Sequence, residues 1–492
     1  ALYNIPRMYK LTIHHEGLIS TITTDGSDLL LKVLRDHGYE IYAPCGGNGT
    51  CGKCKVWLRE EGSVTSCIYY IERDLEVILP DRKEASILVS QHEYTIKVPF
   101  MPGPAVNISA FPHGVAIDIG TTTLVFYLVN LVTGTIVETR AMMNPQALFG
   151  GDVITRINYT AQNPKGLSAL QKAIIKAINA QLEHFVEVTG IQKDDLVKLT
   201  IAGNTTMLHL LMGVDPLPIA LAPFDAPFLE EQVLDGKTLD LRCNPEAEVK
   251  LLPSISAYVG ADIVAGVASI KPSDEYQRYL FMDIGTNGEL ALVTPNKVWC
   301  CATAAGPAFE GDRISCGLGA VVGAISAFEN GKLSVIGDET PIGICGSGLI
   351  DIVAYLVERG LVQSDGLLEE DFELVPVNQS DNGCPISITQ SDIREVQLAK
   401  SALAAGVNIL MKNAGLRHED IDAVFLAGGF GNYINKESAM KIGLISAEFK
   451  DKIISLGNTS GTGAVLALKS IQFDDLVEAL RARTEYIELS GD

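Results

Sequence analysis

Two short segments of the sequence place an aspartate and a glycine where they could bind phosphate. Residues 115–122 read VAIDIGTT and residues 281–289 read FMDIGTNGE, so Asp118 and Asp283 occupy equivalent positions. A glycine lets the backbone turn tightly, and neighbouring N–H and hydroxyl groups suit phosphate oxygens. A carboxylate at a strand end can hold Mg²⁺ or orient a water molecule. The candidate phosphate donors are Gly120, Thr121, Thr122, Gly285, Thr286 and Asn287.

An Asp-x-Gly-Thr segment can also be an ordinary turn, and one copy alone would leave both interpretations open. The two copies, however, share their surroundings. The first is followed by an apolar run over 124–131, a Thr133-Gly134 turn and further apolar residues. The second is followed by an apolar run over 289–293, a Pro295-Asn296 turn and further apolar residues. Such runs predict β-hairpins, and their repetition predicts a duplicated fold with a functional motif in each half.

Four cysteines near the N-terminus form a second candidate site. Cys45, Cys51 and Cys54 have the spacing C-x5-C-x2-C, and Cys67 follows. In a cytosolic chain such clustering favours metal or redox chemistry over a disulfide framework. The glycines around Cys51 would let a loop wrap an iron–sulfur cluster and aim N–H groups at its sulfurs. A structural zinc site is the alternative, although zinc sites usually pair two C-x2-C units and this chain has one.

The composition indicates a globular protein of several folding units. The chain has 492 residues, of which 47% are hydrophobic and 20% charged, so core size is no constraint. A formal net charge of -22 argues against nucleic acid or an anionic membrane as the main partner. No apolar run is long enough to span a bilayer and residues 1–10 show no signal-peptide pattern, which predicts a cytoplasmic location.

These candidate residues must be positioned by a limited set of elements. Alternation predicts a hairpin around residue 17, followed by a helix over 29–37 and strands over 55–58 and 75–79. Four prolines in 94–114 predict a semi-rigid linker; an irregular surface segment of one larger domain is the alternative. Beyond it, strands are predicted over 197–202 and 423–427, and helices over 168–188, 207–212, 258–269, 349–358 and 397–414.

Two glycine-rich turns stand where a predicted helix begins or a predicted strand ends. The first contains Gly346, Ser347 and Gly348, and the second begins with Gly428 and Gly429. Backbone N–H groups in such turns can reach a phosphate or a nucleoside. Taken singly, each turn would more often be a helix entry or a close packing contact.

About the first ninety residues resemble the [2Fe-2S] ferredoxins of the adrenodoxin and plant-type superfamily, which share a β-grasp fold. The resemblance implies that Cys45, Cys51, Cys54 and Cys67 hold a [2Fe-2S] cluster. The short interval between Cys54 and Cys67 departs from the family pattern. Cys67 is nevertheless followed by residues 74–80, DLEVILP, in the manner of the last ferredoxin strand.

From Gly114 onward the order of the motifs resembles the superfamily of acetate and sugar kinases, heat-shock chaperone ATPases and actin. This resemblance implies a duplicated, ribonuclease H-like α/β ATPase whose two actin-like lobes close on Mg-ATP. Residues 118–122 resemble the first phosphate motif and residues 283–289 the second. The adenosine motif would consist of Gly428, Gly429, Phe430 and Gly431.

Taken together, these two regions of the chain resemble the reductive activators of corrinoid proteins. Further similar stretches are 144–146 (NPQ), 151–154 (GDVI), 202–207 (AGNTTM) and 304–311 (AAGPAFEG). The expected organisation is an α+β [2Fe-2S] domain over 1–93, a linker over 94–113 and an α/β ATPase over 114–492. The expected partners are a corrinoid protein, an upstream low-potential electron donor and, as one option for assembly, a second copy of the chain in a homodimer.

The resemblance implies one-electron reduction of a Co(II) corrinoid to Co(I), assisted by ATP. Asp118 and Asp283 would place Mg²⁺ and water, with Glu289 and Glu310 as further candidates for positioning water. Residues 306–311 would face the partner or pack between elements. A small-molecule kinase with an iron–sulfur sensor domain and an ATP-binding metallocentre chaperone remain as alternatives. Slow ATP hydrolysis stimulated by a corrinoid protein would count against both.

Overall fold

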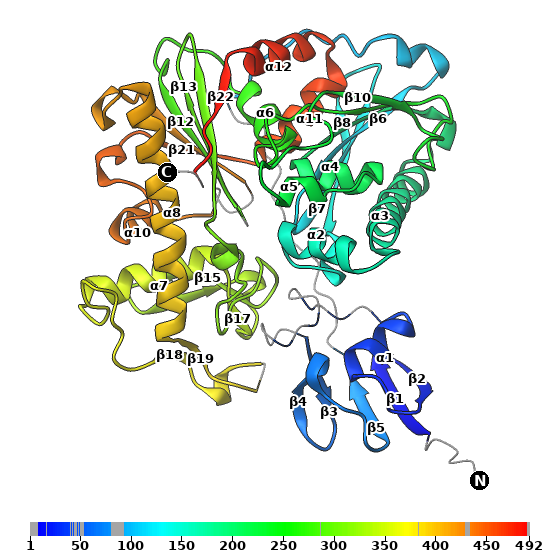
Figure 1. Cartoon of the computed structure of the whole chain (residues 1–492), viewed down its shortest axis with the longest axis vertical. Helices are drawn as coiled ribbons and strands as arrows, with labels where there is room; N and C mark the ends of the chain where they lie inside the picture. The colour runs from blue at the N-terminus through cyan, green and yellow to red at the C-terminus, as the bar shows by residue number, and fades with distance from the viewer. Residues whose placement is uncertain are drawn as a thin grey trace. The chain divides into compact units, whose positions relative to one another are not determined.

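The structure of the protein is a computed structural model that describes residues 8–15, 17–39, 41, 43, 47, 49, 54–79, 93–285, 287–381, 383–428 and 433–489. Two compact units divide the chain (Figure 1). The first comprises residues 1–84 and 145–170, and the second comprises residues 85–144 and 171–492. The described cysteines Cys54 and Cys67 belong to the first unit, whereas both Asp-Ile-Gly motifs belong to the second.

The first unit is built around a five-stranded sheet of order β2-β1-β5-β3-β4. Its antiparallel β1–β2 pair confirms the predicted hairpin, and β1 also pairs in parallel with β5. Fully buried Leu11, Ile13, Leu34 and Val77 join the sheet and α1 in one apolar core. The elements are β1 (Tyr9–His15), β2 (Leu18–Thr24), α1 (Leu30–Asp36), β3 (Lys55–Leu58), β4 (Gly62–Thr65), β5 (Leu75–Ile78) and, later in the chain, α2 (Val153–Gln162).

Two six-stranded sheets form the framework of the second unit. The first half contributes β6 (His113–Ile119), β7 (Thr123–Asn130), β8 (Ile136–Met143), β9 (Leu196–Gly203), β10 (Gln232–Asp235) and β11 (Glu248–Leu251). The second half contributes β12 (Tyr279–Ile284), β13 (Gly288–Val293), β14 (Val298–Thr303), β20 (Ala423–Ala427), β21 (Ile453–Gly457) and β22 (Thr484–Tyr486).

The two sheets share a core of five strands and differ in the sixth, which is β10 beside β11 in the first sheet and β22 beside β14 in the second. Their strand orders are β10-β11-β9-β6-β7-β8 and β21-β20-β12-β13-β14-β22. In each, three antiparallel strands lead to two parallel ones, namely β9 and β11 in the first sheet and β20 and β21 in the second. The shared order confirms the duplication predicted from the repeated motif. All residues of β9 are buried, as expected for a central strand covered on both faces.

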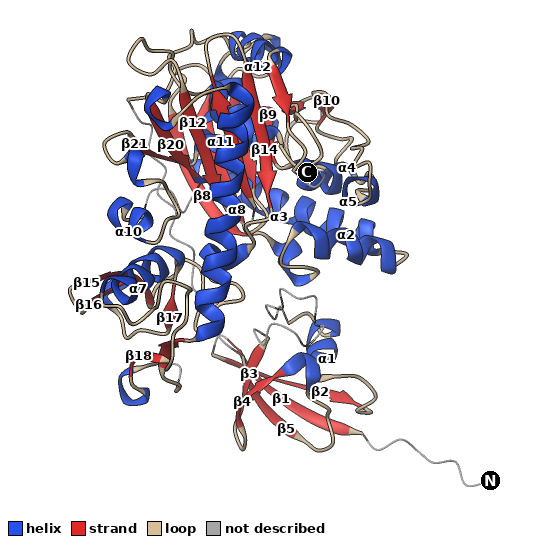
Figure 2. Cartoon of the chain, turned by 60° about the vertical axis from the view of Figure 1, so that its left-hand side comes forward, coloured by secondary structure: helices blue, strands red, loops and turns tan. Residues whose placement is uncertain are grey.

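Helices and two small sheets complete the second unit. Helix α8 begins at a Thr389–Asp392 capping box, ends at Gly415 in the left-handed conformation and lies along the second large sheet (Figure 2). The helices are α3 (Gly166–Thr189), which starts in the first unit, α4 (Thr205–Met212), α5 (Leu217–Ala220), α6 (Ala261–Ala268), α7 (Gly346–Glu358), α8 (Gln390–Ala414), α10 (Lys436–Lys441), α11 (Thr459–Lys469) and α12 (Gln472–Ala482). The small sheets contain β15 (Ala324–Glu329), β16 (Lys332–Val335), β17 (Gly343–Ile344), β18 (Phe372–Val375) and β19 (Ile386–Ile388).

Helices α6 and α11 cross between the two large sheets and pack against each other (Figure 1). Helix α6 follows the first sheet in the chain, yet Val264 and Val267 lie with Ala291 of the second sheet around one small cavity. Helix α11 follows the second sheet, yet the carbonyl oxygen of Ala464 accepts a 2.7 Å hydrogen bond from Thr200 of β9. Each lobe therefore packs against a helix that follows the other lobe in the chain.

Glycines make this crossing close. A Cβ atom at Gly463 would collide with the carbonyl oxygen of Ala265 on α6. A Cβ atom at Gly266 would come within 2.7 Å of the Thr459 hydroxyl oxygen on α11. Small residues at these positions allow the two backbones to approach to a distance that a larger side chain would prevent.

The predicted linker is attached to the second unit along much of its length. It contains a short 3₁₀ turn over Pro104–Ile108. Its backbone forms isolated β-bridges, one between Thr95 and Ile270 and one between Met101 and Ser470. The prolines predicted an extended segment, but these attachments left no pattern in the sequence because main-chain groups make them.

Substitution at the helix crossing should lower stability. We expect Gly463→Val to reduce the free energy of unfolding by about 2 kcal/mol, because the side chain would force α11 away from α6. Gly319→Val is the matched control, since a Cβ atom there meets no atom of the described residues within 4 Å. Denaturant titration of both variants would measure the difference, and equal midpoints would contradict close packing at the crossing.

Candidate nucleotide and metal sites

Asp118 is the last residue but one of β6 and is held by the start of α11. Its Oδ1 accepts a 2.7 Å hydrogen bond from Ser460, and its Oδ2 accepts a 2.8 Å bond from the Asn458 side-chain amide. The Asn458 side-chain oxygen also accepts from the Gly461 N–H and so caps α11. The aspartate of the first repeat is therefore oriented by a helix that begins at the second sheet.

Asp283 occupies the equivalent place in the second sheet. It is in register with Ala427 of parallel β20, and Gly428 follows with a positive φ of 83°. A Cβ atom at Gly428 would lie 2.5 Å from Asp283 Oδ1. Glycine is required there because it accepts the left-handed conformation and leaves space for the carboxylate.

Three further carboxylates complete the cluster. Glu289 stands directly opposite Asp283 in the β12–β13 pair and is 8% exposed. Asp262 lies in the first turn of α6. Glu310 Oε1 accepts a 3.2 Å hydrogen bond from the Thr122 hydroxyl, which joins the first phosphate motif to the second lobe.

Burial and mutual repulsion raise the pKa of Asp262, Asp283 and Glu289. Burial, together with Asp262, Asp118 and Glu310, raises the pKa of Asp283 to about 8. Burial and the charge of Asp118 raise the pKa of Asp262 to about 7. Burial, Asp262 and Asp283 raise the pKa of Glu289 well above its ordinary value. Ionising all of them at once would place several negative charges in one poorly solvated space.

Asp118 differs from the rest of the cluster. Burial raises its pKa, but the hydrogen bonds from Ser460 and Asn458 oppose that shift by stabilising the carboxylate. Among the described residues, no group of three or more His, Cys, Asp or Glu side chains is placed to hold a metal ion by itself. Mg²⁺ usually binds through one or two carboxylates, water and phosphate, so this electronegative cluster still fits it.

Two asparagines fix the loop that was predicted as the first phosphate motif. Asn144 donates from its side chain to the Gly120 carbonyl at 2.8 Å and from its N–H to the Thr122 carbonyl at 2.8 Å. Asn204, which caps α4, donates to the Thr121 hydroxyl at 2.9 Å. The loop is thus held in place by side chains from two other segments.

The second loop and the adenosine motif are described in part. The Gly285 N–H donates to the Asn287 carbonyl at 3.0 Å. A Cβ atom at Gly285 would meet no atom of the described residues closer than 3.8 Å, so their packing does not explain this glycine. The predicted residues Thr286, Gly429, Phe430 and Gly431 lie outside the described residues.

Other predicted segments are occupied by packing. Ser347 is 4% exposed and donates to the Ser326 carbonyl at 2.7 Å. A Cβ atom at Gly348 would collide with the Ile325 carbonyl, so this turn fits α7, which begins at Gly346, against β15. Ala308 and Phe309 are buried in the core of the second lobe, which supports the packing interpretation of residues 306–311.

Cys54 and Cys67 lie together in the first unit. They are 0% and 3% exposed, and the Cys67 N–H donates to Cys54 Sγ at 3.4 Å. A Cβ atom at Gly47 would lie 3.9 Å from Cys67 Cβ, so Cys67 lies close to this glycine. Cys45 and Cys51 lie outside the described residues.

Sequence reasoning missed Asp262, Asn458, Ser460 and Asn204. Asp262 stands two residues after Gly260 within the predicted helix 258–269, and Asn458 and Ser460 stand in a glycine-rich helix start. An acidic or amide side chain at such a start was a usable signal. In the described residues no helix is long and apolar enough to cross a membrane.

The raised pKa of Asp283 predicts a pH-dependent stability. The folded protein retains a proton on this group up to about pH 8, so its contribution to stability is lost as pH rises from the ordinary aspartate pKa through that value. Without divalent cations, we expect Asp283→Asn to raise the free energy of unfolding at about pH 8 by roughly 2 kcal/mol, with little effect at about pH 4. Urea titrations at both pH values measure this, and an equal effect at both would contradict the assignment.

Two family models match most of the chain. Residues 113–273 match the family model described as the RACo middle region, and residues 277–492 match the C-terminal domain of RACo, the ASKHA domain. ASKHA denotes the acetate and sugar kinase, heat-shock chaperone and actin superfamily. The second match begins just before β12.

Individual relatives cover most of the chain. It is 35% identical to the corrinoid activation enzyme RamQ of Eubacterium limosum, over 96% of this chain and 95% of RamQ. It is 26% identical to a [Co(II) methylated amine-specific corrinoid protein] reductase of Methanosarcina barkeri, over 76% and 73%. A solved structure of a reductive activator for corrinoid, iron-sulfur protein matches with a TM-score of 0.71 and 30% identity, over 98% and 96%. The chain belongs to the family of reductive activators of corrinoid proteins.

Proposed function

We propose that this protein reduces the Co(II) centre of a corrinoid protein to Co(I) in an ATP-dependent, one-electron reaction. The observation that carries the proposal is the cluster of carboxylates formed by both Asp-Ile-Gly repeats, in a chain similar to RamQ over nearly its whole length. The buried cysteine pair supports a redox role in the same chain. The kinase alternative is not favoured, since the relatives are named as an activation enzyme and a reductase.

The first step of the proposal concerns the electron carrier. Residues 1–93 would form a β-grasp domain in which Cys45, Cys51, Cys54 and Cys67 hold a [2Fe-2S] cluster. The five-stranded sheet with α1 supports the fold, and the N–H of Cys67 directed at Cys54 Sγ supports a thiolate site. Such a cluster, when bound, supplies single electrons, so an upstream low-potential donor must replace each electron that passes to cobalt.

The second step concerns nucleotide binding by residues 114–492, which residues 94–113 link to the first domain. Asp118 and Asp283 would hold Mg²⁺ and a water molecule. Asp262, Glu289 and Glu310 would orient water molecules, including those bound to the ion. The N–H and hydroxyl groups of both loops would contact phosphate, and Gly428 would begin the adenosine motif. A cation and a phosphate chain would relieve the repulsion that raises the carboxylate pKa values.

The energetic role of ATP follows from this arrangement. Reduction to Co(I) is uphill, so ATP must favour one partner-bound conformation over another. The α6–α11 crossing joins the two lobes, and nucleotide can drive these lobes to close. The partners would be a corrinoid protein and an electron donor in the cytoplasm, with a homodimer as one option for assembly, and without nucleic acid or a membrane.

The test is anaerobic reduction of a Co(II) corrinoid protein, followed by the visible absorption of cobalt. We expect Co(I) to form with reduced protein and ATP, at a rate lowered about 100-fold by Asp118→Asn, because a charge that organises the site is lost. Cys54→Ala should abolish the reaction and the visible absorption of the iron–sulfur centre.

Asp475→Asn is the control for Asp118→Asn, since it removes the charge of an exposed carboxylate on α12, outside the carboxylate cluster. It should retain the wild-type rate. Absence of Co(I) despite an intact cluster and bound ATP would contradict the proposed function.

A further inference from the structure

The segment that precedes the first large sheet is attached to the end of α6. The Ile96 N–H donates to the Ser269 carbonyl at 2.8 Å, and the Lys271 N–H donates to the Tyr94 carbonyl at 2.7 Å. Both partners stand immediately after α6, whose first turn carries Asp262. The segment is therefore held by a helix that also bears part of the carboxylate cluster.

The same segment is attached to the end of α11. The Met101 N–H donates to the Lys469 carbonyl at 2.9 Å, and the Ile471 N–H donates to the Met101 carbonyl at 2.9 Å. Helix α11 holds Asp118 through its first turn. Residues 94–102, which we call the strap, thus bind the C-terminal ends of both crossing helices.

The strap is also attached to both lobes. The Tyr94 ring packs edge-on against Phe425 of β20 with ring centroids 5.7 Å apart. At the other end, Lys198 of β9, which is 1% exposed, donates to the Pro102 carbonyl at 2.7 Å. A rotation of one lobe relative to the other would strain at least one of these attachments, because the strap is short and partly fixed by proline.

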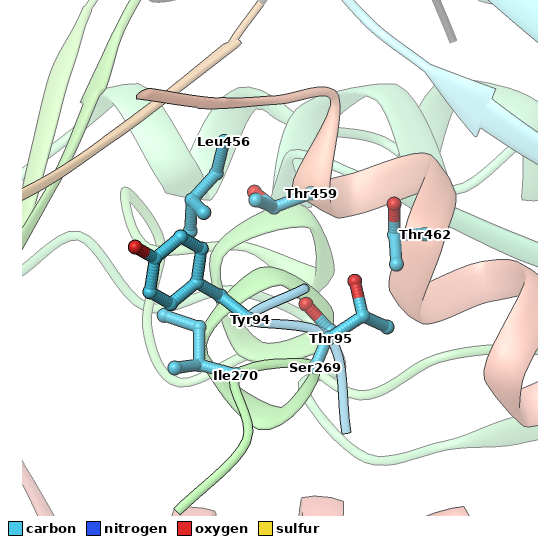
Figure 3. Close-up of a pocket in the computed structure, with 7 residues that line it drawn as sticks. All are labelled: Tyr94, Thr95, Ser269, Ile270, Leu456, Thr459 and Thr462. Atoms are coloured by element: carbon cyan, nitrogen blue, oxygen red, sulfur yellow. The ribbon is translucent and has the colours of Figure 1, made fainter. Parts of the chain in front are cut away.

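A small pocket connects the strap to the residues that hold Asp118. Its lining includes Tyr94 and Thr95 of the strap, Ser269 after α6, and Thr459 and Thr462 of α11 (Figure 3). The buried Thr459 hydroxyl oxygen has no hydrogen-bond partner in the described residues. The next residue, Ser460, donates to Asp118, so a shift of α11 reaches the strap and the carboxylate together.

We propose that the strap couples the nucleotide state of the lobes to the chain segment that leads to the cysteine-bearing unit. Nucleotide binding at the carboxylate cluster moves α6 relative to α11, and the strap exchanges or loosens its main-chain hydrogen bonds as a result. By linkage, a strap held in its attached form changes nucleotide affinity by the same factor. This inference rests on the proposed function, because it requires nucleotide to bind between the lobes.

Hydrogen exchange in the full-length wild-type protein tests the coupling without a corrinoid partner. We expect Mg²⁺ with a non-hydrolysable ATP analogue to change the exchange rates of the Ile96, Met101, Lys271 and Ile471 amides by about 10-fold or more. A change confined to the loop at residues 118–122 would contradict the coupling role of the strap but not the proposed nucleotide site. No change at either location would contradict both proposals.

A matched pair of proline variants tests the functional consequence. Ile96→Pro removes the N–H that is donated to Ser269, whereas Lys97→Pro places the same residue at an exposed neighbour whose N–H has no main-chain partner in the described residues. The measured quantity is the ratio of Co(I) formation with ATP to that without ATP. We expect this ratio to fall toward one in Ile96→Pro and to stay at the wild-type value in Lys97→Pro, with ATP-independent reduction retained in both. A wild-type ratio in Ile96→Pro would overturn the proposal.

Discussion

The structure of the second unit depends on the close crossing of α6 and α11. Each helix follows one large sheet in the chain and packs on the other, and glycines at 266 and 463 allow the two backbones to meet. The first turn of α11 fixes Asp118, and the first turn of α6 carries Asp262. Carboxylates that repel one another are therefore held together because the packing of two helices places them there. Apolar burial along the crossing offsets the electrostatic cost.

The opposition between apolar packing at the crossing and repulsion between the carboxylates explains how one site could use nucleotide to drive a conformational change. Carboxyl groups with raised pKa values form a cluster, and a bound divalent cation would stabilise their ionised forms. Since the carboxylates come from both lobes, a ligand that joins them also joins the lobes. The strap would transmit the movement of α6 and α11 to the chain segment that leads to the cysteine-bearing unit. Nucleotide binding and electron transfer would then be linked through the two crossing helices.

The sequence predicted the parts of this site that are local. Asp118 and Asp283 could be found because apolar alternation and turn residues determine where each strand ends. Asn458 and Ser460 could not, because they reach Asp118 from more than 300 residues away through helix packing. Gly348 resembled a phosphate-binding glycine locally, whereas its contact with Ile325 depends on the tertiary position of β15. The attachments of the strap could not be predicted either, since main-chain hydrogen bonds do not require particular side chains. The short strands from β15 to β19 lacked a pattern long enough to predict.

The most direct test of the account is the proton release that accompanies binding of Mg²⁺ with an ATP analogue. Calorimetric titrations in buffers of different ionisation enthalpy measure it. At about pH 7 the account predicts release of about one proton from the cluster, because Asp283 is then mostly protonated and a bound cation favours its ionised form. The release should disappear at about pH 10 and should decrease in Asp283→Asn. Binding without proton release at about pH 7, or release that Asp283→Asn leaves unchanged, would contradict the claim that the nucleotide site is this carboxylate cluster.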